Sequence, residues 1–210
     1  MRLLQQPWPL KLIWLLLLGE ACAALLNGEG IVGAVALTTF GLTLVPLYVG
    51  RVSGVHIPSG FLVAIAAFLM ATLFLGEMRD FYERFWWWDI VLHIGSAVAF
   101  GLAGVVLMLI LVRGERLTAA PITVAFFAFC FAVTIGVFWE IIEFTADQTL
   151  GTNTQKSGLV DTMWDLIVDC IGALVGAAAG WVYLKGEQGW VLTGALREFV
   201  HRNGRMFRPR

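Results

Sequence analysis

Charged side chains are scarce in this sequence. Only 14% of the 210 residues are Asp, Glu, Lys or Arg, whereas 59% are hydrophobic and the mean hydropathy is +0.82. A water-soluble domain of this length cannot hide so large an apolar fraction in one core, so the composition predicts a membrane protein. The formal net charge of -1 gives no general attraction to nucleic acid, and we expect no nucleic-acid partner.

Cysteine is rare as well. Cys22, Cys130 and Cys170 each lie in an apolar run, and no two of them have the CxxC spacing. This pattern excludes a disulfide scaffold of the secreted kind and a thiolate metal site. We expect all three to be small buried apolar residues.

Familiar catalytic signatures are also lacking. The chain has no phosphate-binding loop, no nucleophile elbow and no redox motif. A function must therefore be argued from single polar residues inside the apolar runs, and the sequence assigns no reaction.

Long apolar stretches fill most of the chain. A membrane-spanning helix needs about 20 consecutive apolar residues, and six stretches approach or exceed this length. We predict an all-α, polytopic transmembrane bundle, with residues 1–184 as a single helical domain and residues 185–210 as a basic cytoplasmic tail. The predicted spans are Pro9–Leu26, Ile31–Val49, Ser59–Leu75, Trp88–Val112, Ala120–Phe144 and Leu159–Leu184.

The distribution of Lys and Arg predicts the orientation. With a cytoplasmic N-terminus, three basic residues, Arg79, Arg84 and Lys156, fall outside. Both termini are then cytoplasmic, in a multi-pass protein of the bacterial inner membrane with membrane lipids as partners. The basic tail anchors the chain at the cytoplasmic side, and contact with anionic headgroups is an alternative. The cytoplasmic set is Arg2, Lys11, Arg51, Arg113, Arg116, Lys185, Arg197, Arg202, Arg205, Arg208 and Arg210.

The N-terminus allows two interpretations. Residues 1–19 combine basic residues with a short apolar run, and Ala21-Cys22-Ala23 resembles a signal-peptidase site. Glu20 interrupts the small-residue region, however, and the apolar character continues through Leu26. We therefore favour an uncleaved first span over a removed signal peptide.

The polar chemistry is concentrated on the last three spans. Because the fourth and sixth spans run inward and the fifth runs outward, the acidic groups of all three should meet near the outer ends of the helices. Gly172, Gly176 and Gly180 follow the last aspartates at the small-xxx-small spacing, which favours close helix packing. The predicted cluster consists of Asp89, His93, Glu140, Glu143, Asp161, Asp165 and Asp169.

No Lys or Arg lies within these three spans to pair with the carboxylates. An unpaired carboxylate at membrane depth costs at least about 2.5 kcal/mol, so something must neutralise the cluster. The candidates are a divalent metal ion, protonation of some carboxylates, or the outer residues Arg79, Arg84 and Lys156. Oxygen ligands with one imidazole suit Mg, Mn, Fe or Zn.

We predict Glu140, Glu143, Asp161, Asp165, Asp169 and His93 as metal ligands, with Asp89 and His93 as further ligands or as a general acid/base pair. The preferred function is that of a metal-binding membrane protein, and one form of it is a metal-dependent enzyme acting on a lipid or another amphiphile. The alternatives are a proton or cation pathway, and a structural or assembly factor.

Several residues of the region have simpler interpretations. Asp89 and Asp161 each begin a predicted helix and could be N-caps. Asp147 is expected to be an interfacial carboxylate. His56 and His201 are expected on the cytoplasmic side, away from the cluster.

Several motifs together resemble the YjdF-like family of bacterial inner-membrane proteins. They are Gly76-Glu77-Met78-Arg79-Asp80-Phe81-Tyr82, Trp88-Asp89 with His93, Trp139-Glu140 with Glu143, and Gly151-Thr152-Asn153 leading to Gly158-Leu159-Val160-Asp161-Thr162-Met163-Trp164-Asp165. The resemblance covers roughly the second to the sixth span. It implies a polytopic helical architecture and implies no reaction.

The ladder of Asp161, Asp165 and Asp169 also looks like the end of the CDP-alcohol phosphotransferase signature. The remainder of that signature is absent, and we do not assign the chain to that family.

Overall fold

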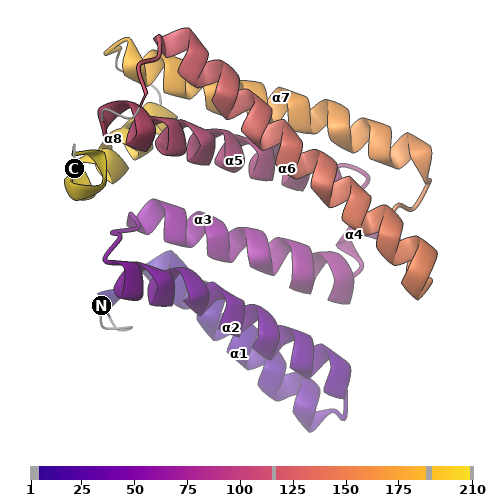
Figure 1. Ribbon diagram of the computed structural model, residues 1–210. Coiled ribbons are helices and arrows are strands. Elements are labelled where there is room, and N and C mark those ends of the chain that lie inside the picture. The colour runs from indigo at the N-terminus through magenta and orange to yellow at the C-terminus, as the bar shows by residue number, and fades with distance from the viewer. Residues whose placement is uncertain (1–4, 115–116, 188–190, 209–210) are drawn as a thin grey trace. The chain divides into compact units, whose positions relative to one another are not determined.

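The computed structural model describes residues 5–114, 117–187 and 191–208. Within these ranges every regular element is helical and no strand is present, which confirms the all-α prediction. Six of the described helices are long and apolar enough to cross a membrane. They are α1 (Trp8–Leu26), α2 (Gly30–Ser53), α3 (Ser59–Leu69) continued by the π-helix η2 (Met70–Met78), α5 (Trp88–Arg113), α6 (Pro121–Leu150) and α7 (Leu159–Leu184) (Figure 1). The shorter elements are α4 (Phe81–Arg84), α8 (Val191–Arg202) and the 3-10 helix η3 (Gly204–Phe207).

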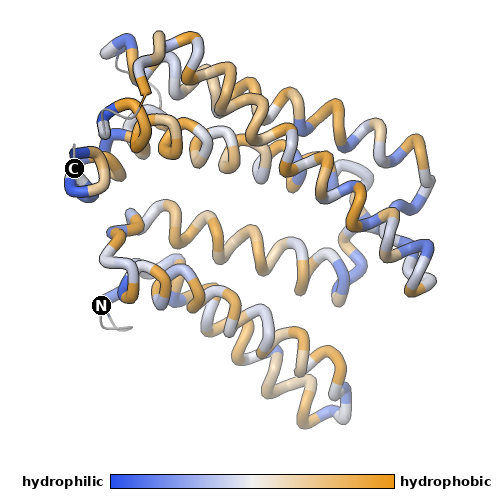
Figure 2. Tube along the Cα trace, in the orientation of Figure 1, coloured by the Kyte–Doolittle hydropathy of each residue, from blue (hydrophilic) through white to orange (hydrophobic). Residues whose placement is uncertain are grey.

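The six long helices are apolar along most of their length, with hydrophilic residues gathered toward the helix ends and connections (Figure 2). Large apolar side chains such as Leu15, Phe126 and Ile171 are exposed on the protein surface. Exposure of such side chains to water is unfavourable, whereas exposure to lipid is not. The helices also satisfy the hydrogen bonds of their own backbone, as a lipid environment requires. The observed surface is that of a multi-pass membrane protein.

The fifth predicted span differs from the structure at its end. It was expected to stop near Phe144, but α6 continues to Leu150 and ends at Gly151, which has φ 69°. The hydroxyls of Thr145 and Thr149 donate hydrogen bonds to carbonyl oxygens one turn earlier, at 2.7 Å each. The polar residues therefore end the apolar stretch without ending the helix.

The chain divides into two compact units, Met1–Trp88 and Asp89–Arg210. The first unit contains α1, α2, α3, η2 and α4. In its core the Trp14 indole donates a hydrogen bond to the Thr43 hydroxyl at 2.8 Å and packs edge-on against Phe40. Two clusters of buried residues form this core, Leu10, Trp14, Leu62 and Ala66, and then Leu17, Ala21, Ala36 and Phe74.

Two of the three basic residues predicted on the outer side, Arg79 and Arg84, have acidic partners within the first unit. Arg79 forms an ion pair with Glu20 of α1 and lies 5.5 Å from the centre of the Phe74 ring. Arg84 lies 3.8 Å from Asp80. The sequence did not reveal the Glu20 pairing, because the two residues are 59 positions apart.

The second unit is built on α5, α6 and α7, and its helices approach at small residues. A Cβ at Gly176 would lie 2.6 Å from the Val98 carbonyl oxygen and 3.0 Å from the Gly101 Cα. A Cβ at Gly104 of α5 would lie 2.9 Å from the Ala128 Cα of α6. Backbone atoms of neighbouring helices thus come into direct contact, as the predicted small-residue spacing requires.

The C-terminal segment folds onto the same unit. In α8, Thr193, Leu196 and Val200 are buried, while Arg197 and Arg202 are exposed. Arg113, at the end of α5, donates a hydrogen bond to the Tyr183 hydroxyl at 3.2 Å and stacks over the rings of Tyr183 and Phe207. Of the basic residues used to predict the orientation, Arg2, Arg116 and Arg210 lie outside the described residues.

The expectation of buried cysteines is wrong. Cys22 is exposed, and Cys130 and Cys170 are half-buried; all three are free thiols. Apolar side chains of a membrane helix gain little from being covered by protein, since lipid is an equally apolar neighbour.

Candidate metal centre

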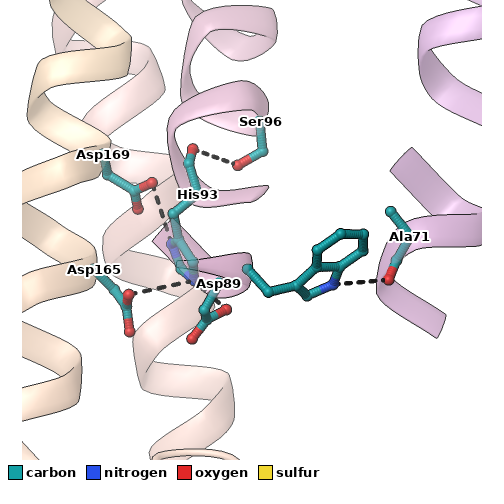
Figure 3. A network of polar contacts seen from close by, with 7 residues as sticks. Ala71, Asp89, His93, Ser96, Asp165 and Asp169 are labelled. Atoms are coloured by element: carbon teal, nitrogen blue, oxygen red, sulfur yellow. Dashed lines mark hydrogen bonds and ion pairs between the residues drawn. The ribbon is translucent and has the colours of Figure 1, made fainter. Parts of the chain in front are cut away.

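The first two turns of α5 and α7 bring three polar side chains together. Asp89 and His93 lie one turn apart on α5, and Asp165 lies in the second turn of α7. The His93 ring points from α5 toward α7, with Asp165 and Asp169 on one side and Asp89 below it (Figure 3). His93 and Asp165 are buried, whereas Asp89 is partly exposed.

The two ring nitrogens of His93 face different partners. Nδ1 lies 3.2 Å from Asp169 Oδ1, within hydrogen-bond distance. Nε2 lies 3.8 Å from Asp89 Oδ1 and 3.9 Å from Asp165 Oδ1, which is too long for a hydrogen bond. A proton on Nδ1 can be donated to Asp169, and the lone pair of Nε2 is then directed between the two other aspartates.

The separations around Nε2 are close to those of a metal site. One ligand atom from each of Asp89, His93 and Asp165 lies within 4.8 Å of the others. Metal–ligand bonds of about 2.0–2.2 Å place neighbouring ligand atoms roughly 3.0–3.5 Å apart. The gaps from Nε2 to the two aspartates, 3.8 and 3.9 Å, exceed this range by about 0.3–0.9 Å, so side-chain rotations must draw the three groups together around an ion.

Asp169 is held from its other side by α6. A Cβ at Gly136 would lie 2.2 Å from Asp169 Oδ2, so the carboxylate occupies the space that the glycine leaves. Asp169 is only 3% exposed. Its two oxygens are thus committed to His93 and to the surface of α6. The contact between Gly136 and this carboxylate joins residues 33 positions apart, so the sequence did not reveal it.

Glu140, one turn after Gly136 on α6, is the least satisfied polar group of the cluster. It is 4% exposed, and neither of its oxygens has a hydrogen-bond partner among the described residues. The Thr162 hydroxyl, which accepts a hydrogen bond from Gln155 Nε2 at 2.6 Å, lies beside this carboxylate. Glu140 also lies within electrostatic range of His93 and of the three aspartates of α7.

Glu143 and Asp161 lie at the margin of the cluster. Glu143 is half-buried and interacts electrostatically with Asp89, Glu140 and Asp165. Asp161 is also half-buried, and Lys156 lies within its electrostatic range. All seven predicted residues are therefore gathered in one region of the second unit, and their function as ligands remains a prediction.

The N-cap interpretation of Asp89 and Asp161 does not match the structure. The N-cap of α7 is Gly158, and Asp161 lies three residues later within the first turn. Asp89 is the second residue of α5. Both carboxylates therefore stand on the helices, where their side chains are available to the cluster.

Asp147 has a structural task that the sequence did not reveal. Its carboxylate accepts hydrogen bonds from the Thr152 hydroxyl, from the backbone N–H groups of Thr154 and Gln155, and from the Thr154 hydroxyl, at 2.6–2.9 Å. The residue organises the connection between α6 and α7 and does not join the cluster. The Thr152–Gln155 segment, rich in hydroxyl groups, was the available signal.

A family of predicted membrane proteins, DUF2238, matches residues 10–186 of the chain. The chain belongs to this family. The DUF2238 match runs from α1 through α7 and includes every residue of the cluster. This membership agrees with the six apolar helices and makes the protein a membrane protein independently of the hydropathy argument.

A protein of Thermotoga maritima described as "Uncharacterized protein" is 31% identical over 128 residues, which is 60% of this chain and 65% of that relative. The match spans just under two thirds of the relative's length. No solved structure matches the chain.

Proposed function

We propose that this protein binds a divalent metal ion between α5 and α7, with Asp89, His93 and Asp165 as ligands. The observation that carries the proposal is the convergence of their three ligand atoms within 4.8 Å of one another. A divalent ion there would also offset the negative charge of the buried carboxylates. Among the described residues of α5, α6 and α7, no Lys or Arg lies within the cluster to do so.

Asp169 fits the role of an orienting residue better than that of a ligand. Metal-binding histidines usually donate their second ring N–H to a carboxylate, which fixes the tautomer and the ring orientation. The 3.2 Å contact between His93 Nδ1 and Asp169 Oδ1 supplies such a partner. The negative charge of Asp161, the remaining predicted ligand of α7, is offset by the positive charge of Lys156. We do not propose Asp161 as a ligand.

Two carboxylates and one imidazole suit Mg, Mn, Fe or Zn. A bound ion of this kind would supply a Lewis acid for a phosphoryl or carbonyl oxygen, or an activated water. We propose a lipid or another amphiphile as the substrate. Asp89 is partly exposed, and large apolar side chains such as Trp164 and Ile167 are exposed on the same helix as Asp165, so an amphiphile can approach from the lipid.

A transmembrane ion pathway is less well supported. Beyond Asp169, α7 continues with Gly172, Gly176 and Gly180, and these residues contact the backbone of α5 or the side chain of Val105 directly. Such packing leaves no polar route toward the other ends of these helices. It favours a site that opens to one side.

The proposed setting is the bacterial inner membrane, with both termini cytoplasmic and the cluster toward the outer face. Fusions test this orientation. Alkaline phosphatase inserted in the 151–158 connection should be active, and a fluorescent protein at the C-terminus should fluoresce. The reverse pattern would refute the orientation. We also propose that the YjdF-like resemblance and the DUF2238 membership describe the same grouping.

Elemental analysis tests the metal site directly. The detergent-purified protein is dialysed against a weak chelator, beside an Asp165→Asn/Asp169→Asn variant and an Asp147→Asn control whose carboxylate lies outside the cluster. We expect at least one metal ion per chain in the wild type and the control, and loss of metal in the folded double variant. Wild-type protein without metal would overturn the proposal.

The enzymatic part has its own test. Manganese-loaded protein in mixed micelles of phospholipid and detergent should release a product that mass spectrometry detects, and the Asp165→Asn/Asp169→Asn variant should release none. Equal products from both proteins would refute a metal-dependent activity on these lipids.

A further inference from the structure

The buried carboxylate of Glu140 is not a ligand in the proposed site of Asp89, His93 and Asp165. The Asp89, His93 and Asp165 set draws its ligands from α5 and α7 only, whereas Glu140 projects from α6. A buried carboxylate without a partner is costly at membrane depth, and structures rarely retain one without a ligand or a function.

Glu140 does not stand alone on its helix. Glu143, three residues later, lies on a neighbouring part of the same face and within electrostatic range of Glu140. Both residues are also within electrostatic range of Asp165. Asp165 is thus near both sets of groups, with its Oδ1 atom 3.9 Å from His93 Nε2.

Charge supports a second cation. The six carboxylates of the cluster carry six negative charges when ionised, and one divalent ion with Lys156 supplies three positive charges. Three negative charges then remain in a region where six carboxylates repel one another. A second divalent ion reduces the excess to one. The carboxylates are Asp89, Glu140, Glu143, Asp161, Asp165 and Asp169.

We infer that the cluster holds a second divalent cation, bound by Glu140 and Glu143 of α6 and sharing Asp165 with the first ion. This inference rests on the proposed function and extends it from a single-metal site to a two-metal site. Two-metal sites with shared carboxylates stabilise both the attacking and the leaving oxygen of a displacement at phosphorus, which narrows the substrate class to phosphate esters or diphosphates of lipids.

The test counts bound Mn²⁺ per chain in the detergent-solubilised full-length protein by titration followed by electron paramagnetic resonance. We expect two Mn²⁺ ions with spin coupling in the wild type and in Asp147→Asn. We expect one uncoupled ion in Glu140→Gln and in Glu143→Gln.

The other outcomes distinguish the second cation site from the single-metal site of the proposed function. One uncoupled ion in the wild type overturns the second site and leaves the proposed function standing. No bound Mn²⁺ in the wild type overturns both. Two ions in the folded Glu140→Gln and Glu143→Gln variants overturn the assignment to α6. Spin coupling between two Mn²⁺ ions in the wild type tests for the second cation even where a glutamate variant fails to fold.

Discussion

Replacing Gly136 by alanine should weaken metal binding without unfolding the protein. The added Cβ would lie 2.2 Å from Asp169 Oδ2 and 3.0 Å from its Cγ, well inside van der Waals contact. The Asp169 side chain can rotate away, whereas the helix backbone cannot. Rotation breaks the 3.2 Å contact between Asp169 Oδ1 and His93 Nδ1, so the imidazole loses the group that orients it.

The size of the effect follows from the loss of that orienting carboxylate. Removing a partner of this kind lowers metal affinity by about 10- to 100-fold, equivalent to about 1.4–2.7 kcal/mol. The stability of the fold should change much less, because the clash is relieved at the end of one side chain. Alanine also has a higher helix propensity than glycine, by about 1 kcal/mol, which partly offsets any strain.

The assay is the dissociation constant for Mn²⁺ in detergent, with the thermal unfolding midpoint measured on the same samples. Gly95→Ala is the matched control, since a Cβ at this glycine of α5 meets no atom within 4 Å. The control should keep wild-type affinity.

A double-mutant cycle identifies the route of the effect. In an Asp169→Ser background the clash with Gly136→Ala is absent, so the second substitution should cost almost nothing further. Unchanged affinity in Gly136→Ala, or equal losses in both backgrounds, would refute the assignment of Asp169 as the orienting residue.

Three further predictions concern the scaffold. Gly176→Ala places a Cβ 2.6 Å from the Val98 carbonyl oxygen and should lower the stability of the second unit by about 1–3 kcal/mol, measured by thermal unfolding in detergent. Asp147→Ala removes the acceptor for the amides of residues 154–155 and should speed their hydrogen exchange. Glu20→Gln breaks the pair with Arg79 and should cost no more than about 1 kcal/mol, since both side chains are partly exposed, with recovery in the charge-swapped double variant.

Each of these has a contradicting result. Gly41→Ala, which meets no atom within 4 Å, should be harmless, and a loss as large as that of Gly176→Ala would remove the packing explanation. Unaltered hydrogen exchange of these amides in Asp147→Ala would show that other contacts order the connection between α6 and α7. Failure of the charge swap to restore the stability lost in Glu20→Gln would show that another contact of Arg79 matters more.

The sequence by itself determined the membrane spans. An apolar run of about 20 residues can satisfy its backbone only as a helix in lipid, whatever its neighbours are, so span number and order are local properties. The direction of each span then follows from the order, and this placed Asp89, Glu140 and Asp165 at one end of their helices. Local apolarity did not determine where a helix ends, as the extension of α6 to Leu150 shows.

Tertiary structure decided the roles within the cluster. Residues i and i+4 share a helix face, but the rotation of each helix and the rotamer of each side chain decide which atoms meet. The packing of the helices decided that Asp169 contacts Nδ1 of His93, whereas Nε2 faces Asp89 and Asp165. Only packing enclosed Glu140 without a partner, because the contact of α6 with α7 that buries it depends on residues far apart in the chain.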